Sequence, residues 1–211
     1  MVDLGLRRSG ILLPLFSLPG NTGIGTMGET AYSFIDILKK SGQTYWQLLP
    51  LGVTDKGNSP YQCFSSFAGN PYFIDLDILA GEGLLEEGDY ANLDFGDNVN
   101  SVDYEKIYNN RYPVLRKASE NFFKHIPAQY KEFCETNSYW LDTYCCFMAL
   151  KDLHNGVCWR EWDDKYKYRD NAALSEFVEK SKKEIEFDMK KKIHDTDSHY
   201  YAVIKVEQSY V

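Results

Sequence analysis

The chain has 211 residues, a formal net charge of −8 and a pI of about 5.0, which disfavours nucleic acids and anionic membranes as partners because both require basic patches. Hydrophobic residues make up 44% of the sequence, enough for one sizeable core or two small ones, and no apolar run approaches the ~20 residues of a membrane span. The five cysteines include no CxxC pair, so we expect reduced thiols and a cytoplasmic location, without a disulfide framework or a zinc site.

The first predicted elements form a strand–helix–strand unit. Gly10–Phe16 is almost wholly apolar and predicts a buried strand, and Tyr45–Leu51 predicts a second one. Between them, Glu29–Lys40 carries apolar residues at helical spacing and is followed by Ser41 and Gly42, a typical helix end. Because connections of this kind return the chain in the same direction, we expect the strands to be adjacent and parallel, with the helix packed across them.

A GxGxxG motif, made of Gly23, Gly25 and Gly28, lies between the first strand and the helix. This is the fingerprint of dinucleotide-binding folds, but there the phosphate turn follows the strand directly. Here Ser17–Thr22 intervenes, and the second strand ends at Gly52 without the acidic residue that would bind a ribose. The motif therefore favours a glycine-rich turn before a helix, and a nucleotide-binding enzyme remains a less favoured alternative.

A long loop follows the second strand, from Gly52 to Leu76. It combines aromatic residues with short polar ones, and its aromatic content is too high for a disordered segment. Aromatic rings stack on the apolar faces of sugars, and short polar groups bind their hydroxyls. The composition of this loop therefore favours a carbohydrate-binding role at the end of a buried strand.

The second half of the sequence is helical. We expect Ser101 to cap the first of its helices and Pro113 to break or kink it. Pro127 can open another helix, which is expected to end near Glu135. Further helices are predicted at Tyr139–Leu153, capped by Ser138, and at Asn171–Lys192. His194 and His199 have no recognised metal-binding spacing, so the sequence predicts neither a metal nor a cofactor.

Several of these stretches resemble one family. RSGILLPLFSLPGNTGIGTMG, YWQLLPLG and GNSPYQCFSSFAGNPYFIDL are similar to the amino-terminal part of the 4-α-glucanotransferases of glycoside hydrolase family 77, the amylomaltases or disproportionating enzymes. VDYEKIY, YWLDTYCCFMALK and the W-x-x-W pair resemble the helical insertion that follows in that family. The resemblance covers the chain from about Arg8 to Lys192.

The resemblance implies an α/β fold, in which the first part of a (β/α)₈ TIM barrel is followed by a mainly helical insertion subdomain. Residues 1–100 are then the amino-terminal barrel portion, 101–192 the helical subdomain and 193–211 a truncated tail. A whole barrel takes about 250 residues, so we expect the barrel to be incomplete and the chain to be an amino-terminal fragment.

The resemblance also implies an activity: transfer of α-1,4-glucan segments between maltodextrins by a retaining double displacement, without a cofactor. Tyr61 matches a family tyrosine that stacks near the scissile bond, Ser59 a polar neighbour that binds a sugar, and Gln62 completes that motif. Many family members carry an aromatic residue of a second glucan site where this chain has Lys56, which puts that site in doubt.

The catalytic carboxylates of the family lie on later barrel strands, and nothing after Lys192 matches them. We therefore expect no catalytic residue in this chain, no activity of the chain alone, and the missing carboxyl-terminal half of the barrel as its partner. A non-catalytic glucan-binding or interaction module is the alternative.

Overall fold

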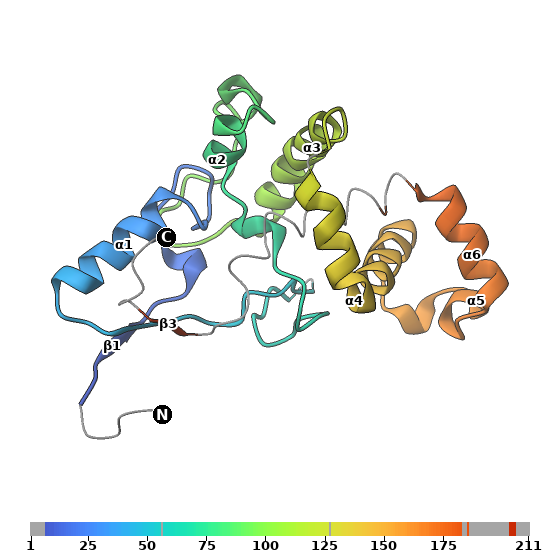
Figure 1. The fold of residues 1–211 in the computed structure, drawn as a ribbon, viewed down its shortest axis with the longest axis horizontal. Helices are drawn as coiled ribbons and strands as arrows, with labels where there is room; N and C mark the ends of the chain where they lie inside the picture. The colour runs from blue at the N-terminus through green and yellow to red at the C-terminus, as the bar shows by residue number, and fades with distance from the viewer. Residues whose placement is uncertain (1–6, 56, 127, 183–184, 186–202, 206–211) are drawn as a thin grey trace. The chain divides into compact units, whose positions relative to one another are not determined.

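The computed structural model describes residues 7–55, 57–126, 128–182, 185 and 203–205. The chain divides into two compact units, unit 1 being Met1–Phe122 with Asp195–Val211 and unit 2 being Phe123–His194. Unit 1 combines a small sheet with helices, and unit 2 is helical (Figure 1). In the part of the chain that is described, none of the helices has the length and apolarity that a membrane span requires.

The sheet of unit 1 has the strand order β1-β2-β3. β1 (Gly10–Leu12) and β2 (Tyr45–Gln47) are adjacent and parallel, as the strand–helix–strand pattern predicts, although both are shorter than the apolar runs that predicted them. β3 (Val203–Lys205) lies on the other side of β2 and is antiparallel to it. The parallel pair fits the start of an α/β sheet, whereas β3 departs from the all-parallel pattern of a (β/α)₈ barrel.

The prediction that the first strand is buried is wrong for β1. All three of its residues are exposed, Ile11 by 42% and Leu12 by 56%. Among the described residues, β1 is an edge strand of the sheet and pairs with β2, so no described strand covers its second edge. The apolar sequence of β1 is therefore typical of a covered strand, but its place at the edge exposes it.

Helix α1 (Glu29–Lys40) has the predicted bounds and packs on the sheet (Figure 1). Ala31 and Leu38 of its apolar stripe are buried in the core of unit 1. The helix is followed by Gly42 with φ of +71°, a conformation that glycine adopts without a steric penalty. A local sequence signal therefore determines the carboxyl end of this helix.

Trp46 of β2 is the centre of the core of unit 1. Its side chain is fully buried and meets the ring of Phe34 edge-on, with 5.0 Å between the ring centroids. Its indole nitrogen donates a hydrogen bond of 2.8 Å to the carbonyl oxygen of Leu13, directly after β1. This one side chain thus joins both parallel strands and α1.

The three glycines of the GxGxxG motif are in close contact with other segments of the protein. A Cβ atom added at Gly23 would lie 2.2 Å from the carbonyl oxygen of Phe95. A Cβ atom at Gly25 would lie 2.0 Å from the carbonyl oxygen of Leu15, and one at Gly28 would lie 1.9 Å from the carboxylate of Asp75. Each glycine therefore allows two segments to pack closely. This supports the interpretation of the motif as a turn before α1 rather than as a phosphate-binding loop.

Short helices connect the larger elements of unit 1. They are η1 (Leu15–Ser17), η2 (Pro71–Phe73), α2 (Leu76–Gly81) and η3 (Glu87–Asp89). The side chain of Asp75 caps α2, since its Oδ1 accepts hydrogen bonds from the backbone amides of Asp77 and Ile78 at 3.0 and 3.1 Å. Asp75 thereby fixes where the long loop ends.

Helix α3 (Tyr104–Phe122) corrects the predicted break at Pro113 and the predicted cap at Ser101. It continues through Pro113, which is exposed, because buried residues such as Ile107 and Leu115 hold the helix on both sides of it. Its first turn is capped by Asp103 rather than by Ser101, since Asp103 Oδ1 accepts a hydrogen bond of 3.1 Å from the amide of Lys106. Packing of the apolar face offsets the hydrogen bond that a proline removes.

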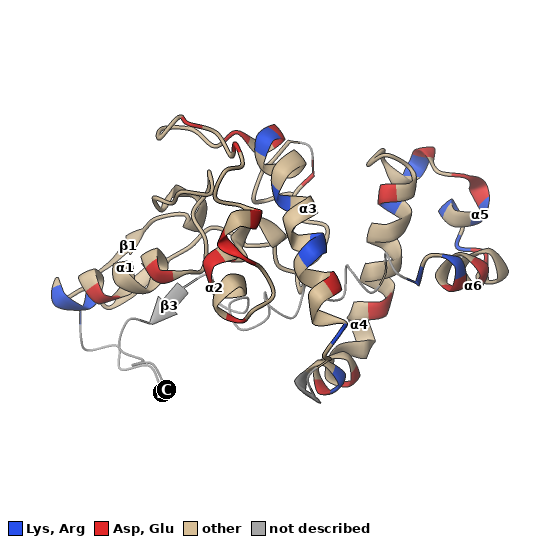
Figure 2. Cartoon of the chain, turned by 90° about the horizontal axis from the view of Figure 1, so that it is seen from above, with Lys and Arg blue, Asp and Glu red and all other residues tan. Residues whose placement is uncertain are grey.

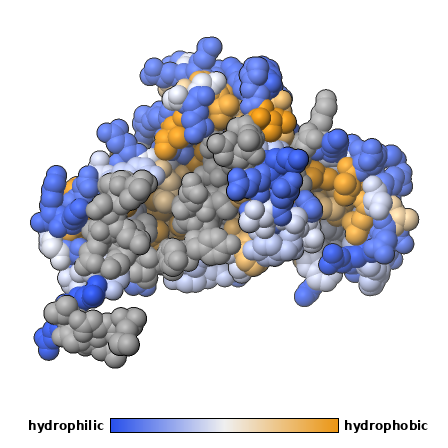
Figure 3. All heavy atoms as spheres, in the orientation of Figure 1, coloured by the Kyte–Doolittle hydropathy of each residue, from blue (hydrophilic) through white to orange (hydrophobic). Residues whose placement is uncertain are grey.

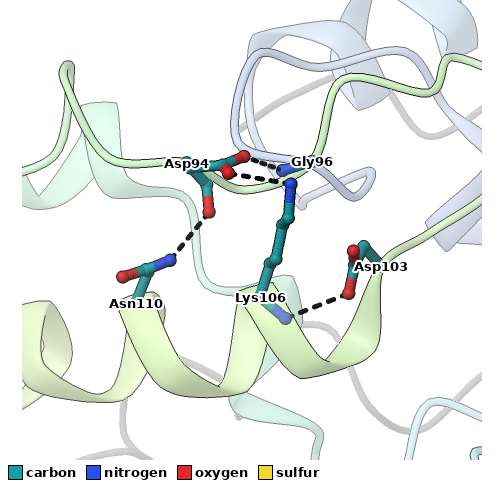
Figure 4. Close-up of polar contacts among 5 residues, drawn as sticks. All are labelled: Asp94, Gly96, Asp103, Lys106 and Asn110. Carbon is teal, nitrogen blue, oxygen red and sulfur yellow. Dashed lines mark hydrogen bonds and ion pairs between the residues drawn. The ribbon is translucent and has the colours of Figure 1, made fainter.

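A polar latch fastens the loop at Asp94 and Gly96 to α3 (Figure 4). Lys106 Nζ lies 2.8 Å from Asp94 Oδ2, and Asn110 Nδ2 donates a hydrogen bond of 2.7 Å to the carbonyl oxygen of Asp94. The Lys106 ammonium and the amide of Gly96 hold the pKa of the Asp94 carboxyl below its ordinary value. These contacts place Phe95 against Gly23, so the latch also positions the glycine-rich loop.

Arg111 of α3 is fully buried in unit 1. Its Nη2 donates a hydrogen bond to the carbonyl oxygen of Ile74, whereas Nε and Nη1 have no hydrogen-bond partner among the described residues. Burial lowers the pKa of Arg111 to about 10, although the nearby Asp75 opposes this effect. The guanidinium remains charged at neutral pH and ties α3 to the end of the long loop.

Unit 2 contains α4 (Ala128–Leu153), η4 (Trp159–Glu161), α5 (Asp164–Lys167) and α6 (Asn171–Lys180). The prediction of two helices separated at Ser138 is wrong, because α4 runs through this position and the Ser138 hydroxyl donates to the carbonyl oxygen of Glu135. α6 ends before the predicted Lys192, and residues 186–192 lie outside the described residues.

Trp162, the second tryptophan of the W-x-x-W pair, is buried among aromatic side chains of unit 2. Its ring stacks on His154, with 5.1 Å between centroids, and lies 5.4 Å from the ring of Phe147. The first tryptophan of the pair, Trp159, is 47% exposed. Trp162 therefore packs in the interior of unit 2, whereas Trp159 lies partly on its surface.

Candidate functional site

The loop that follows β2 folds back on itself as an irregular hairpin. Isolated antiparallel bridges join Gly52 to Gly69 and Thr54 to Cys63. The amide of Phe64 donates to the carbonyl oxygen of Val53 at 3.0 Å, and backbone bonds of this kind tie the outgoing half of the loop to the returning half. The loop is thus ordered by its own backbone, as its aromatic composition predicts.

Close packing at Gly52 determines the width of this hairpin. A Cβ atom at Gly52 would lie 2.8 Å from both the Cβ and the Sγ of Cys63. The Cys63 thiol donates to the carbonyl oxygen of Pro60 at 3.0 Å, and burial raises the pKa of this thiol. Cys63 is therefore a protonated packing residue at neutral pH and not a nucleophile.

The tip of the hairpin forms two successive turns, and the second one holds Ser59, Tyr61 and Gln62. Asp55 Oδ1 accepts a hydrogen bond of 2.9 Å from the amide of Gly57, and the amide of Gln62 donates to the carbonyl oxygen of Ser59 at 3.0 Å. The second turn projects Tyr61 outwards, with 73% of its surface exposed. Lys56, the position of the doubtful second glucan site, lies outside the described residues, as do His194 and His199.

A hollow of about 490 Å³, here called the Tyr61 hollow, lies against this hairpin. It is lined by residues of the strand end, the tip and the returning half: Leu49, Pro50, Leu51, Gly52, Pro60, Tyr61, Cys63, Phe64, Ser65, Ser66 and Ala68. Of the predicted site residues, Tyr61 lines the hollow, whereas Ser59 is half-buried and Gln62 is exposed, and neither lines it. The structure therefore brings Tyr61 to the hollow and leaves the other two beside it.

Ser65 and Ser66 are polar lining residues that the sequence analysis did not single out. The Ser65 hydroxyl oxygen accepts hydrogen bonds of 3.1 Å from the amides of Phe67 and Ala68, which leaves its proton available to a ligand. The repeated small polar residues in the segment FSSF, placed between two aromatic rings, are the signal that could have indicated them.

The other aromatic residues of the loop divide between the surface and the core. Tyr72 and Phe73 are buried in the core of unit 1, whereas Phe67 is 39% exposed. Desolvation by burial raises the pKa of Tyr72. Of these rings, Tyr61 is the one that offers a broad free face beside a hollow. Figure 3 shows further hydrophobic residues among hydrophilic ones over α2 and α3.

The Tyr61 hollow can bind a ligand but offers no acid–base pair. Its lining combines apolar surface, a tyrosine ring and serine hydroxyls, which suits a sugar with apolar faces and hydroxyl edges. No aspartate or glutamate is among its lining residues. Within the described residues, no group of three or more His, Cys, Asp or Glu side chains is placed to hold a metal ion. The arrangement supports binding and orientation rather than bond cleavage.

Comparison with known proteins identifies a family. The profile of 4-alpha-glucanotransferase, glycoside hydrolase family 77, matches residues 13–194. A 4-alpha-glucanotransferase of Clostridium butyricum is 47% identical over 171 residues, which is 81% of this chain and 35% of that protein. A 4-alpha-glucanotransferase of Streptococcus pneumoniae is 46% identical over 175 residues, which is 82% of this chain and 35% of that protein. The chain thus spans about 35% of the length of these relatives.

Two solved structures are also similar. The amylomaltase from Streptococcus agalactiae in complex with acarbose matches 90% of this chain and 39% of its own, with a TM-score of 0.86 and 39% identity. The amylomaltase from Corynebacterium glutamicum matches 88% of this chain and 27% of its own, with a TM-score of 0.58 and 15% identity, which shows a shared fold alone.

Proposed function

Because this chain belongs to the 4-alpha-glucanotransferase family, glycoside hydrolase family 77, we propose that it takes part in the transfer of α-1,4-glucan segments between maltodextrins. The observation that carries this proposal is Tyr61, a largely exposed ring at the edge of a polar and apolar hollow, on the loop directly after β2. The ring stacks on one glucosyl unit, and Ser65 and Ser66 bind its hydroxyls.

We also propose that unit 1 supplies the first part of a (β/α)₈ barrel. The parallel pair β1 and β2, with α1 packed on it, is the repeating unit of such a barrel. The exposed apolar side chains of β1 support this, because further strands of a barrel would cover them. The proposal rests on these three elements, since β3 is antiparallel to β2.

The proposed reaction is a retaining double displacement, which requires two carboxyl groups about 5–5.5 Å apart. The Tyr61 hollow has no carboxylate in its lining, so the role of this chain is to bind and orient the glucan. Stacking of a sugar on Tyr61 also removes water from that face, which favours transfer to a second sugar over hydrolysis. All five cysteines are free thiols, which supports a cytoplasmic location.

The test is equilibrium binding of maltotriose and maltoheptaose to the 211-residue chain, by calorimetry. We expect Tyr61→Ala to weaken binding about fivefold to tenfold, since stacking on one ring contributes roughly 1 kcal/mol. Tyr61→Phe, which keeps the ring, should retain most of the affinity. Tyr168→Ala is the matched control, because Tyr168 is 72% exposed but belongs to unit 2. Equal weakening by the Tyr61→Ala and Tyr168→Ala variants, or by neither, would contradict the proposal.

A non-catalytic glucan-binding module is the second candidate, and the lack of a carboxylate in the lining of the Tyr61 hollow favours it. Both candidates predict glucan binding through Tyr61. They differ in whether glucan transfer occurs when the rest of a family 77 barrel is supplied. Restored transfer on adding the carboxyl-terminal part of the Clostridium butyricum relative would favour the transferase, and its absence in a stable complex would favour the module.

A further inference from the structure

The direction in which Tyr61 points depends on one short turn. The amide of Gln62 donates a hydrogen bond of 3.0 Å to the carbonyl oxygen of Ser59, as in a β-turn. Pro60 is the second residue of this turn, a position that favours proline because its ring fixes φ. Tyr61, the third residue, is 73% exposed, so little packing holds its ring. The backbone of the turn therefore determines where the ring lies.

The peptide group between Pro60 and Tyr61 is the part of the turn that can rotate. Type I and type II turns differ in the orientation of this central peptide, and type II requires a positive φ at the third residue. Tyr61 is not among the residues with a positive φ, which excludes type II. The carbonyl oxygen of this peptide, that of Pro60, accepts a hydrogen bond of 3.0 Å from the Cys63 thiol. The thiol therefore holds the peptide in one orientation.

Cys63 itself lies against the base of the hairpin. A Cβ atom at Gly52 would be 2.8 Å from Cys63 Sγ, so the sulfur is in direct contact with the backbone there. Gly52 forms an antiparallel bridge with Gly69. Next to this bridge, the amide of the buried Asn70 donates a hydrogen bond of 2.8 Å to the carbonyl oxygen of Leu51. The thiol thus connects an exposed turn with the fixed base of the loop.

We propose that Cys63 is a positioning residue for glucan binding: its thiol fixes the Pro60–Tyr61 peptide and thereby holds the Tyr61 ring beside the Tyr61 hollow. This inference rests on the proposed function, because it takes the ring of Tyr61 as the surface on which a glucosyl unit stacks. A ring that is already oriented loses less conformational entropy on binding, so the thiol improves affinity without reacting. Burial raises the pKa of the thiol, which keeps it protonated as a donor at neutral pH.

The described lining of the Tyr61 hollow carries no charged side chain. Charged side chains of unit 1 lie on elements such as α1 and α2, which do not line the hollow (red and blue in Figure 2). The affinity for a neutral glucan should therefore depend on the position of the ring and should change little with salt concentration. A change in Kd between variants then reports geometry rather than charge.

The test is calorimetric binding of maltoheptaose to the 211-residue chain and its variants. Cys63→Ala removes the donor and should raise the Kd about threefold, the loss expected of one weak hydrogen bond. Cys63→Ser keeps an O–H donor, so its Kd should stay within about twofold of the wild type. Cys146→Ala is the matched control, because Cys146 is also a half-buried free thiol but belongs to unit 2, and it should leave the Kd unchanged.

A double-mutant cycle with Tyr61→Ala separates positioning of the ring from a general loss of structure. If the thiol acts through the ring, Cys63→Ala should have no further effect on the Kd in the Tyr61→Ala background. A further increase of the same size there would show that the thiol acts independently of the ring, and it would overturn the inference.

Amide relaxation of the ¹⁵N-labelled chain gives a second measurement, which does not depend on how well Cys63→Ala folds. In the wild type, the order parameters of the Tyr61 and Gln62 amides should be about 0.85, as in rigid backbone, and they should fall in Cys63→Ala. Wild-type values below about 0.6 would show a flexible turn and would overturn the inference without any variant.

Failure of this inference differs from failure of the proposed function. If Tyr61→Ala weakens binding but folded Cys63→Ala binds as the wild type does, the inference is wrong and the proposed function stands. Equal weakening by Cys63→Ser and Cys63→Ala would show that the hydrogen bond is not what matters, and it also overturns the inference. If neither Tyr61→Ala nor Cys63→Ala changes the Kd, the proposed function is wrong and the inference falls with it.

Discussion

Gly23 and Phe95 lie in direct backbone contact: a Cβ atom at Gly23 would be 2.2 Å from the carbonyl oxygen of Phe95. Phe95 is buried, and the latch between Asp94 and Lys106 holds the loop that carries it. Gly23 also has a backbone φ of +77°, a conformation that residues with a side chain rarely adopt. The first glycine of the GxGxxG motif is thus required by a contact 72 positions along the chain.

Replacement of Gly23 by alanine should therefore destabilise the protein for two reasons. The positive φ costs about 1 kcal/mol, and the overlap with Phe95 adds a steric penalty that brings the total to roughly 2–4 kcal/mol. Gly42→Ala is the matched control, because Gly42 has φ of +71° but no neighbouring atom within 4 Å of the place that a Cβ would occupy. Urea denaturation measures the free energy of unfolding of both variants. An equal decrease in the two would show that the contact with Phe95 does not contribute to the effect.

Arg111 allows a buried charge to be compared with its hydrophobic replacement. Arg111→Ala should lower the free energy of unfolding by about 2–4 kcal/mol, because it leaves a cavity and an unpaired carbonyl at Ile74. Arg111→Met fills the volume and removes a charge with two unpaired nitrogens, so it should cost clearly less. If chemical denaturation shows Met to be as destabilising as Ala, the guanidinium contributes more than its volume.

The ion pair between Asp94 and Lys106 predicts that part of the free energy of unfolding depends on pH. The pKa of Asp94 is lower in the folded chain than in the unfolded one, so the unfolded chain binds more protons as the pH falls. The stabilisation is fully present above the unfolded pKa of about 3.9 and is lost as the pH falls through the lower, folded pKa. Asp94→Asn should therefore lower Tm at pH 6. The difference in Tm between the wild type and this variant should become smaller below about pH 4.

Thermal unfolding between pH 3 and pH 7 measures this effect. Asp97→Asn, in the same exposed loop, is the control and should follow the wild type more closely than Asp94→Asn does. A difference between wild type and Asp94→Asn that stays constant over this pH range would mean that the ion pair with Lys106 does not stabilise the fold.

The 211-residue chain is expected to have no glucan transferase activity by itself. Purified chain incubated with maltotriose should form neither glucose nor longer maltodextrins, because the Tyr61 hollow offers no carboxylate pair. Elsewhere in unit 1, Asp75 accepts a hydrogen bond from the Thr26 hydroxyl, and Asp77 accepts one from the Tyr90 hydroxyl. Product analysis by chromatography checks this. Turnover that survives repurification and disappears in Asp77→Asn or Glu29→Gln would overturn the expectation.

The sequence by itself determined the features that depend on neighbouring residues and on long family motifs. Apolar spacing and Gly42 define α1 at Glu29–Lys40, and the apolar runs on both sides of it predict the parallel pair β1 and β2. The stretch from Ser59 to Leu76, with the SPYQ and GNP motifs, indicated the family that the comparisons confirm. The sequence predicts these features because each depends on residues that lie close together along the chain.

Only the tertiary structure decided which groups lie opposite one another. It carries α3 through Pro113, keeps α4 continuous at Ser138, buries Arg111 and leaves β1 exposed. It also places Tyr61 at a hollow while Ser59 and Gln62 lie beside it, and it brings Thr26 and Asp75, which are 49 positions apart, into hydrogen-bond contact. Such contacts depend on the packing of distant segments, and packing energy outweighs the local preferences that a sequence pattern reports.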